Sequence, residues 1–224
     1  MPNRLTKQEL KEDVFVTWVY EVTDKAQRNL VPVLVGVGVV LVVAVGAFLW
    51  SRGNERKETE ARATLAEAST AYWSGNYVRT VQLADQVIAD AGGTKASIDA
   101  TRMKADALFW QGSFDSAATL YREVLSRDKA DSPMRTAVQQ SLAFSLESKK
   151  DYAEAAKLYE EIAAKAPDRP NAADFYVASG RAWRLAGDRA KASAMFAKVA
   201  DEYKETTFAR DAEVALGELA GEAP

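Results

Sequence analysis

An uninterrupted apolar segment lies near the amino terminus, from residue 30 to residue 50. Its 21 positions read LVPVLVGVGVVLVVAVGAFLW and include no charged side chain. At about 1.5 Å of rise per residue, a helix of this length spans roughly 32 Å, which matches the ~30 Å hydrocarbon core of a bilayer. The segment also lacks the polar face that a helix on the surface of a soluble domain would have. The pattern therefore predicts a single transmembrane helix over residues 30–50.

A cleavable signal sequence is the alternative interpretation of this segment. Residues 44–46, Ala-Val-Gly, have the small-x-small form of a cleavage site. The 29 residues ahead of the segment contain five acidic side chains, however, and the segment exceeds the ~7–15 apolar residues of a signal sequence. The segment contains no G-x-x-x-G motif, so a lipid-facing helix is favoured over a specific helix dimer. We expect an uncleaved anchor.

Apolar residues at spacings of three and four precede the anchor and predict an amphipathic helix within residues 1–29. Thr6 and Glu9 fit the capping box that would begin it. Such a helix beside a membrane span lies in the interface or packs on a partner, and tryptophan suits the headgroup level. The β-branched residues near position 16 leave a strand as the alternative. The candidate interfacial face consists of Leu10, Val14, Phe15, Trp18 and Val22.

The remainder of the chain combines apolar periodicity with many charges. Residues 51–60 are predicted to be a charged linker or an extension of the anchor helix, and residues 61–224 a helical domain. Four short turns recur in it at spacings of 37, 38 and 37 residues, which is typical of a stacked repeat. The turns begin at Gly75, Gly112, Lys150 and Gly187.

A small, an aromatic and an aliphatic residue follow each of the last three turns, at steps of four and three. This order lets paired helices approach at the small residue and fill the adjacent gap with the ring. Another apolar-periodic segment precedes each turn, so the unit is a helical hairpin. The residues in this order are Ala117, Tyr121 and Val124, then Ala155, Tyr159 and Ile162, then Ala192, Phe196 and Val199. The first unit is degenerate, with Thr80 and Ala84 at the small and aromatic positions.

These hairpins resemble the tetratricopeptide repeat, most clearly from Ala137 to Pro167. The resemblance implies an all-α fold in which about four hairpins form an α-solenoid after the amphipathic and transmembrane helices. Gly92 and Gly93 are expected in a loop between hairpins, and Asn171 is expected to cap a helix. The final segment, TFARDAEVALGELAG, is expected to form the capping helix that an open-ended stack requires.

Composition narrows the chemistry available to the protein. Its 224 residues include no cysteine and no histidine, which removes their nucleophiles, metal sites and proton shuttles. The sequence shows no phosphate loop, nucleophile elbow or metal-ligand cluster, and its carboxylates alternate with lysines at helical spacing. A net charge of −3 without a basic run argues against nucleic acid. We expect no catalytic residue, cofactor or metal, and a Ser- or carboxylate-dependent hydrolase is the remote alternative.

Binding is the function that remains. A stack of hairpins presents its first helices along a concave surface, where aromatic and arginine side chains could anchor a peptide or a partner helix. Phe109 and Phe144 could instead be ordinary core residues. The paired Lys and Asn residues of the carboxylate-clamp subclass are absent at matching positions. The candidate groove contains Tyr72, Arg102, Asp106, Phe109, Phe144, Glu147, Arg181 and Arg184.

The order of parts resembles the YfgM family of single-span ancillary subunits of the SecYEG translocon. This resemblance implies a bacterial inner-membrane protein with a cytoplasmic amino terminus and periplasmic repeats. The flanks of the span carry five and four basic residues, which leaves orientation undecided by charge. We expect a membrane-anchored scaffold that binds partner proteins, through its groove, its span or the interfacial helix, and tethers or stabilises a larger membrane complex. A translocon-associated holding chaperone is the alternative.

Overall fold

The computed structural model describes residues 17–18, 30–127, 133–165 and 171–221. It is all-α, with nine helices and no strand among these residues, as predicted. Helix α2 (Leu30–Trp73) carries the apolar segment in its first part and the first helix of the repeats in its last part, so residues 51–60 are helical. Contacts divide the chain into two units, residues 1–55 and residues 56–224. Each unit is described by itself below.

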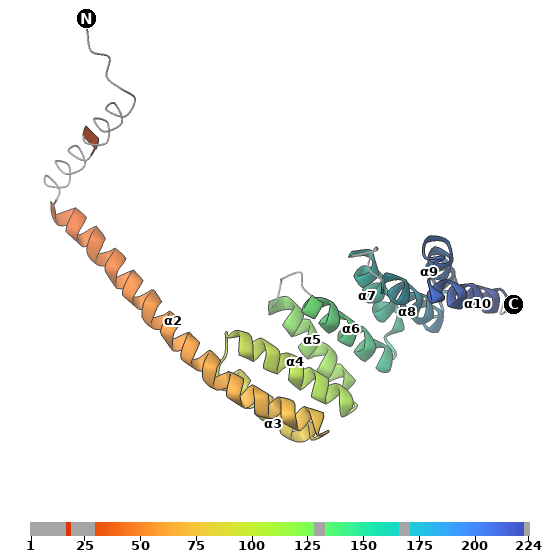
Figure 1. Cartoon of the computed structure of the whole chain (residues 1–224), viewed down its shortest axis with the longest axis horizontal. Coiled ribbons are helices and arrows are strands. Elements are labelled where there is room, and N and C mark those ends of the chain that lie inside the picture. Colours follow the sequence, from red (N-terminus) through yellow and green to blue (C-terminus); the bar gives the residue numbers. More distant parts are fainter. Residues whose placement is uncertain (1–16, 19–29, 128–132, 166–170, 222–224) are drawn as a thin grey trace, which may run out of the picture. The chain divides into compact units, whose positions relative to one another are not determined.

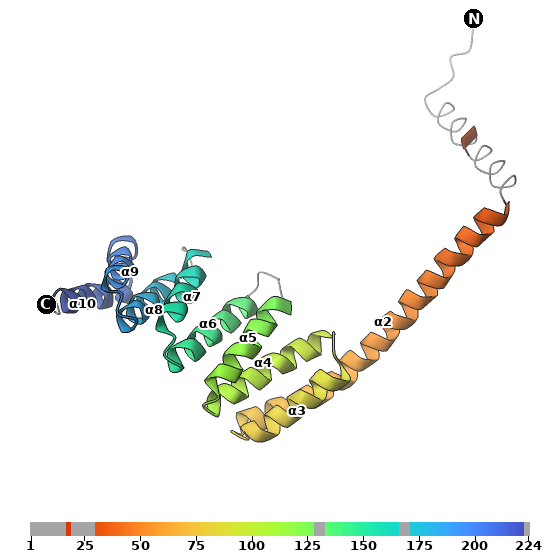
Figure 2. The ribbon, with the colours of Figure 1, turned by 180° about the vertical axis from the view of Figure 1, so that it is seen from behind.

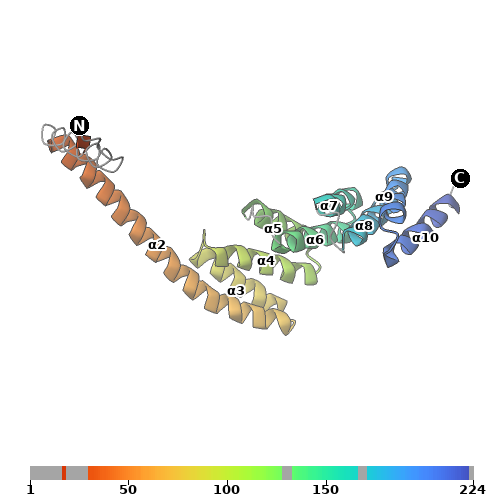
Figure 3. The same cartoon turned by 45° about the horizontal axis from the view of Figure 1, so that its top comes forward.

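The second unit is a series of antiparallel hairpins, each packed on the next (Figures 1 and 2). The end of α2 shares buried clusters with α3. Helix α4 pairs with α5, α6 with α7 and α8 with α9, while α10 packs on α9 and α8 (Figure 3). The predicted four hairpins and terminal helix are therefore confirmed. The bounds are α3 (Tyr77–Asp90), α4 (Lys95–Trp110), α5 (Phe114–Arg127), α6 (Pro133–Ser148), α7 (Tyr152–Lys165), α8 (Ala172–Leu185), α9 (Arg189–Glu202) and α10 (Thr207–Gly221).

The four predicted turns share one backbone geometry. Gly75, Gly112 and Gly187 have φ between 76° and 81°, and Lys150 has φ 71°. This left-handed conformation ends a helix and lets the amide groups after it bond back to the last turn. In the second turn the Gly112 amide donates to the Phe109 carbonyl at 2.9 Å, and the next amide donates to the Leu108 carbonyl at 2.9 Å. The repeated reversal follows from one residue per unit that adopts positive φ, and this residue is glycine in three of the four turns.

The small, aromatic and aliphatic positions form the core, as the pattern predicts. Tyr121 and Tyr159 have exposed fractions of 2% and 1%, and the small and aliphatic residues beside them are also buried. In the fourth hairpin the ring is Phe196, and α8 presents Gly180 to it. A Cβ at Gly180 would lie 2.7 Å from the ring, so only glycine allows this approach. The degenerate first unit still buries Thr80 and Ala84.

Several local predictions have distinct outcomes. Gly92 and Gly93 lie in the loop between α3 and α4, as expected. Asn171 occupies the N-cap position of α8, as expected, although its side chain makes no capping hydrogen bond. Asn76 and Asp188 make such bonds instead, accepting from backbone amides at 3.1 and 3.0 Å. These two residues follow the turn glycines directly, which makes each turn both the end of one helix and the cap of the next.

Candidate functional site

Seven of the eight predicted groove residues, all except Arg102, occupy two repeating positions on the first helices of the hairpins. Three residues before each turn stand Tyr72, Phe109, Glu147 and Arg184, and six residues before the last three turns stand Asp106, Phe144 and Arg181. Residues three apart share a helix face, so each pair presents one stripe along its helix. The fixed distance from the turn gives all the stripes the same height in the stack.

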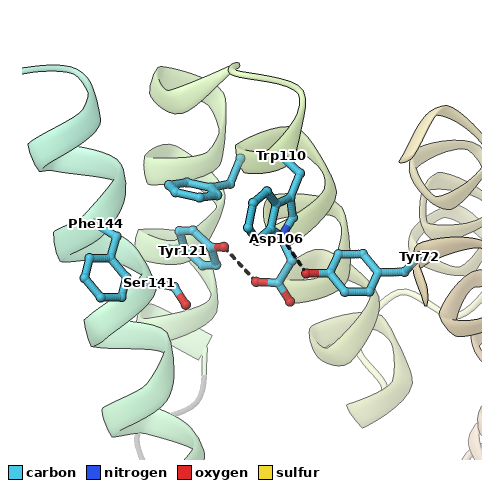
Figure 4. Close-up of a pocket in the computed structure, with 7 residues that line it drawn as sticks. Tyr72, Asp106, Trp110, Tyr121, Ser141 and Phe144 are labelled. Atoms are coloured by element: carbon cyan, nitrogen blue, oxygen red, sulfur yellow. Dashed lines mark hydrogen bonds between the residues drawn. The ribbon is translucent and has the colours of Figure 1, made fainter. Parts of the chain in front are cut away.

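Four of the eight predicted residues line one cavity of about 220 Å³ in the second unit (Figure 4). They come from three helices, with Tyr72 on α2, Asp106 and Phe109 on α4, and Phe144 on α6. The cavity, called the aromatic pocket below, is completed by Trp110, Tyr121 and Ser141. The structure thus brings together side chains up to 72 positions apart, on neighbouring first helices.

A carboxylate lies at the centre of the polar contacts in this pocket. The Tyr121 hydroxyl donates to Oδ1 of Asp106 at 2.7 Å (Figure 4). Arg102, one turn earlier on α4, donates from Nη1 to Oδ2 of Asp106 at 2.7 Å. The Trp110 indole donates from Nε1 to the Tyr72 hydroxyl at 2.8 Å, which joins α2 to α4. Each carboxylate oxygen therefore has one protein donor and, with about two lone pairs, can accept another hydrogen bond.

Burial changes the titration of both partners in the central hydrogen bond. Desolvation raises the pKa of Asp106 above its ordinary 3.8, and the opposing effects of Tyr121 and Arg102 do not cancel it. Burial first, and then the Asp106 charge, raises the pKa of Tyr121 far above its usual range. Tyr121 accordingly stays a hydrogen-bond donor, and ionisation of Asp106 in this site costs free energy. Carboxyl groups with such a shifted pKa cluster at functional sites.

Ring systems form the walls of the pocket. Phe109 and Trp110 meet edge to face at 5.7 Å between centroids, and Trp110 stacks on Tyr77 at 6.4 Å. Phe144 is 41% exposed, and Phe109 is only partly buried against the core. Both phenylalanines line the aromatic pocket, and Phe109 also packs against the hydrophobic core.

The other predicted residues lie elsewhere on the same row of helices. Glu147 accepts from the Tyr159 hydroxyl at 2.8 Å and from Arg181 at 3.4 Å, which repeats the acid and tyrosine contact of the aromatic pocket. Arg181 and Arg184 line a second cavity of about 300 Å³ between α8 and α10, called the charged pocket below. There Arg184 donates to Glu218 at 2.7 Å. The two arginines therefore do not join the aromatic pocket.

Three lining residues escaped the sequence prediction. Tyr121 was assigned to the core by its spacing, and only the structure shows that its hydroxyl reaches Asp106. Trp110 and Ser141 could have been found, because each lies one turn from a predicted residue on the same helix. No group of acidic side chains within the described ranges is arranged to hold a metal ion.

The membrane-facing predictions concern the first unit. The candidate interfacial residues Leu10, Val14, Phe15 and Val22 lie outside the described residues, and Trp18, within them, is helical and exposed. One helix of the described chain, α2, is long and apolar enough to cross a bilayer, with a mean hydropathy of 2.5 in its most apolar window. All of its described side chains from Val31 to Trp50 are exposed.

Hairpins of this geometry with a lined groove on their first helices define the class of helical-repeat proteins that act as protein-interaction scaffolds. A model of the tetratricopeptide repeat-like domain family matches residues 27–169, and the chain belongs to this family. The match begins before α2 and therefore includes the apolar segment as well as the first hairpins. A search of curated proteins finds no match.

Solved helical-repeat structures share the fold. The nearly identical TPR-like repeats of a protein assigned as a kinesin light chain from Podosopora anserina are 18% identical, with 72% of this chain and 86% of that chain covered and a TM-score of 0.58. BtubC (BKLC) from P. vanneervenii is 14% identical, with 75% of this chain and 80% of that chain covered, and has a TM-score of 0.54. MamA AMB-1 is 17% identical, with 72% of this chain and 94% of that chain covered, and has a TM-score of 0.52. At these identities the likeness shows the fold alone.

Proposed function

We propose that this chain is a single-pass, membrane-anchored scaffold that binds partner proteins and tethers or stabilises a larger membrane protein complex. The observation that carries the proposal lies within α2. Its first part exposes every described side chain from Val31 to Trp50, whereas its last part buries Ala61 and Ala68 against the repeats. An exposed apolar surface of that size is unstable in water, and a bilayer is the environment that its length and composition fit.

The location that we propose is the bacterial inner membrane, with the amino terminus in the cytoplasm and the repeats in the periplasm. The inclusion of the apolar segment in the family match favours an anchor that stays with the repeats. The absence of cysteine offers a clean test. Single cysteines at Asn3 and at the exposed Glu213 are treated with a membrane-impermeant maleimide in intact and in permeabilised spheroplasts. Labelling of Glu213→Cys alone in intact spheroplasts supports this orientation, and the reverse result contradicts it.

Scaffolding is proposed without a catalytic step. Asp106, the carboxylate of the aromatic pocket, accepts hydrogen bonds from Tyr121 and Arg102, which suits a binding role better than the activation of a nucleophile. The pocket is lined by rings, which suits recognition of a side chain. A hydrolase remains the remote alternative, and assay of the purified full chain against ester and peptide substrates addresses it.

The tethering role is tested by purification from native membranes in a mild detergent. We expect the chain to elute with a defined set of membrane subunits at fixed stoichiometry, and we expect removal of the chain to reduce the yield of that complex. Recovery of the chain alone, with the amount of every complex unchanged in its absence, would refute the scaffold.

A holding chaperone is the second candidate, and exposed aromatic rings favour it. Trp73 is 82% exposed and Trp110 is 60% exposed at the turn ends of the first two hairpins. Such surfaces can bind many unfolded chains weakly. Suppression of the aggregation of several unrelated unfolded proteins, lost in a Trp73→Ser and Trp110→Ser double variant, would favour the chaperone over a scaffold with one partner.

A further inference from the structure

We propose that the aromatic pocket receives a basic side chain, lysine or arginine, from an extended segment of a partner protein. The inference deepens the proposed scaffold function and rests on it. It names the chemical class of the residue that anchors the partner in the groove.

The size of the pocket limits its occupant. Ligand pockets for drug-sized molecules measure roughly 300–1,000 Å³. The aromatic pocket, at about 220 Å³, is smaller and opens between the first helices, where a helical-repeat groove carries its ligand. One side chain projecting from a bound segment fits this volume.

Charge selects the kind of side chain. Asp106 is the one charged residue among the seven that line the pocket. Arg102, which does not line the pocket, offsets the charge of Asp106 and donates to its Oδ2. The carboxylate still has lone pairs that can accept from an incoming donor. An incoming anion would meet a carboxylate, whereas an ammonium or guanidinium group would gain a charge-assisted hydrogen bond.

The aromatic walls favour the same choice. Tyr72, Phe109, Trp110 and Phe144 present rings around the carboxylate, and the face of a ring attracts a cation. The apolar stem of lysine or arginine can lie along these rings while its charged end reaches Asp106. An apolar side chain from the partner would also contact the rings. It would displace water from the Asp106 carboxylate without replacing the lost hydrogen bonds, which costs free energy.

The charged pocket shows what the opposite arrangement looks like on the same scaffold. Its two arginines, Arg181 and Arg184, stand at the stripe positions that Asp106 and Phe109 occupy two hairpins earlier. Glu218 already pairs with Arg184 there. Of these two pockets, the aromatic pocket combines a single carboxylate, Asp106, with several rings, and it is the one expected to bind the basic residue.

The test uses the full chain in detergent micelles and a phage-displayed library of random nine-residue peptides. We expect the selected peptides to share one lysine or arginine. A selected peptide is then synthesised with that residue and with norleucine, which keeps the stem of lysine and removes the charge. With the native chain, norleucine should weaken binding about tenfold, the effect of roughly 1.4 kcal/mol.

Variants locate the effect. With Asp106→Asn the two peptides should bind within about twofold of each other, because the charge partner is gone. Phe144→Leu, at an exposed ring, should weaken the lysine peptide about threefold. The matched control is Asp85→Asn on α3, which removes an exposed carboxylate paired with Lys104 outside the pocket and should leave the tenfold preference intact.

Other outcomes overturn the inference. Selected peptides without a basic residue, equal binding of the norleucine peptide to the native chain, or an unchanged preference in Asp106→Asn would each do so. Failure to select any peptide would also overturn it. The scaffold proposal is decided separately by co-purification from native membranes, so the two can fail independently.

Discussion

The aromatic pocket and the charged pocket differ although they lie on the same row of first helices. Both are lined at the positions three and six residues before a turn. In the aromatic pocket these positions place rings around Asp106, and in the charged pocket they hold Arg181 and Arg184, which face acids of α10. The repeat backbone therefore fixes where each of these residues stands, and the side chains decide whether rings or paired charges line the pocket.

Removal of α10 should have the largest effect on this comparison. The helix buries Ala209, Ala212 and Leu219 and supplies one wall of the charged pocket. Deletion of residues 207–224 should lower the free energy of unfolding by about 3 kcal/mol, since burial of a leucine side chain alone is worth about 1.5–3 kcal/mol. Urea unfolding followed by circular dichroism measures this. Peptide binding at the aromatic pocket should persist in the folded protein, and its loss would show that the two pockets are coupled.

Gly180→Ala should come next in size. The added Cβ would lie 2.7 to 2.9 Å from three atoms of the buried Phe196 ring, so we expect a loss of about 1–3 kcal/mol from overpacking. Thermal unfolding provides the measurement. Gly217→Ala is the matched control, because a Cβ there meets nothing within 4 Å. It should stabilise α10 by about 0.5–1 kcal/mol, as alanine does in a helix interior. Equal effects of the two variants would contradict the close approach.

Two carboxylates of the first hairpins should respond to pH in opposite directions. Burial alone would raise the pKa of Glu58, but the Ala96 amide, which donates at 2.9 Å, and Arg62 outweigh it, so the pKa lies below 4.5. Glu58 thus adds stability above pH 4.5, which is lost as pH falls through its lowered pKa. Glu58→Gln should destabilise the protein by about 1 kcal/mol at neutral pH, because the neutral amide replaces the charge-assisted hydrogen bond from Ala96 and the ion pair with Arg62, and by less in acid.

Asp106→Asn should show the reverse pH dependence. The raised pKa of Asp106 means that its contribution is most favourable below its unfolded value of 3.8 and is lost as pH rises through the folded value. The variant should therefore be at least as stable as the native chain at neutral pH and relatively less stable in acid. Denaturant midpoints measured at several pH values compare the two variants. If the effects of Glu58→Gln and Asp106→Asn on the free energy of unfolding changed with pH in the same direction, the distinction between a structural carboxylate, Glu58, and a binding carboxylate, Asp106, would be contradicted.

The smallest effect is expected at the third turn. Lys150 has the left-handed conformation that glycine occupies in the other three turns. Lys150→Gly should stabilise the protein by about 0.5–1 kcal/mol, because a side chain is disfavoured at positive φ. Gly112→Ala, at φ 79°, should have the opposite sign. Denaturant unfolding checks both, and peptide binding to Lys150→Gly should be unchanged, since the turn lies outside the aromatic pocket.

Of the eight residues that the sequence predicted to lie together in a groove, four share one cavity in the structure. The period located Tyr72, Asp106, Phe109 and Phe144 on equivalent helix faces, and these four residues share a cavity. It could not separate them from Arg181 and Arg184, which have the same spacing. The two arginines instead line a cavity against α10, from which Glu218, 34 positions after Arg184, reaches Arg184. A contact over such a separation is set by helix packing, and no local pattern encodes it.

The sequence by itself determined the helices, the turns and the apolar segment, because these depend on local physics. Side-chain periodicity over three or four residues sets a helix face, and glycine at positive φ sets a turn. Only the tertiary structure decided that the Tyr121 hydroxyl, assigned to the core by its spacing, reaches Asp106, and that Trp110 joins α4 to Tyr72 on α2. The physical reason is that a pocket consists of side chains from several helices, and their distances follow from how the hairpins stack.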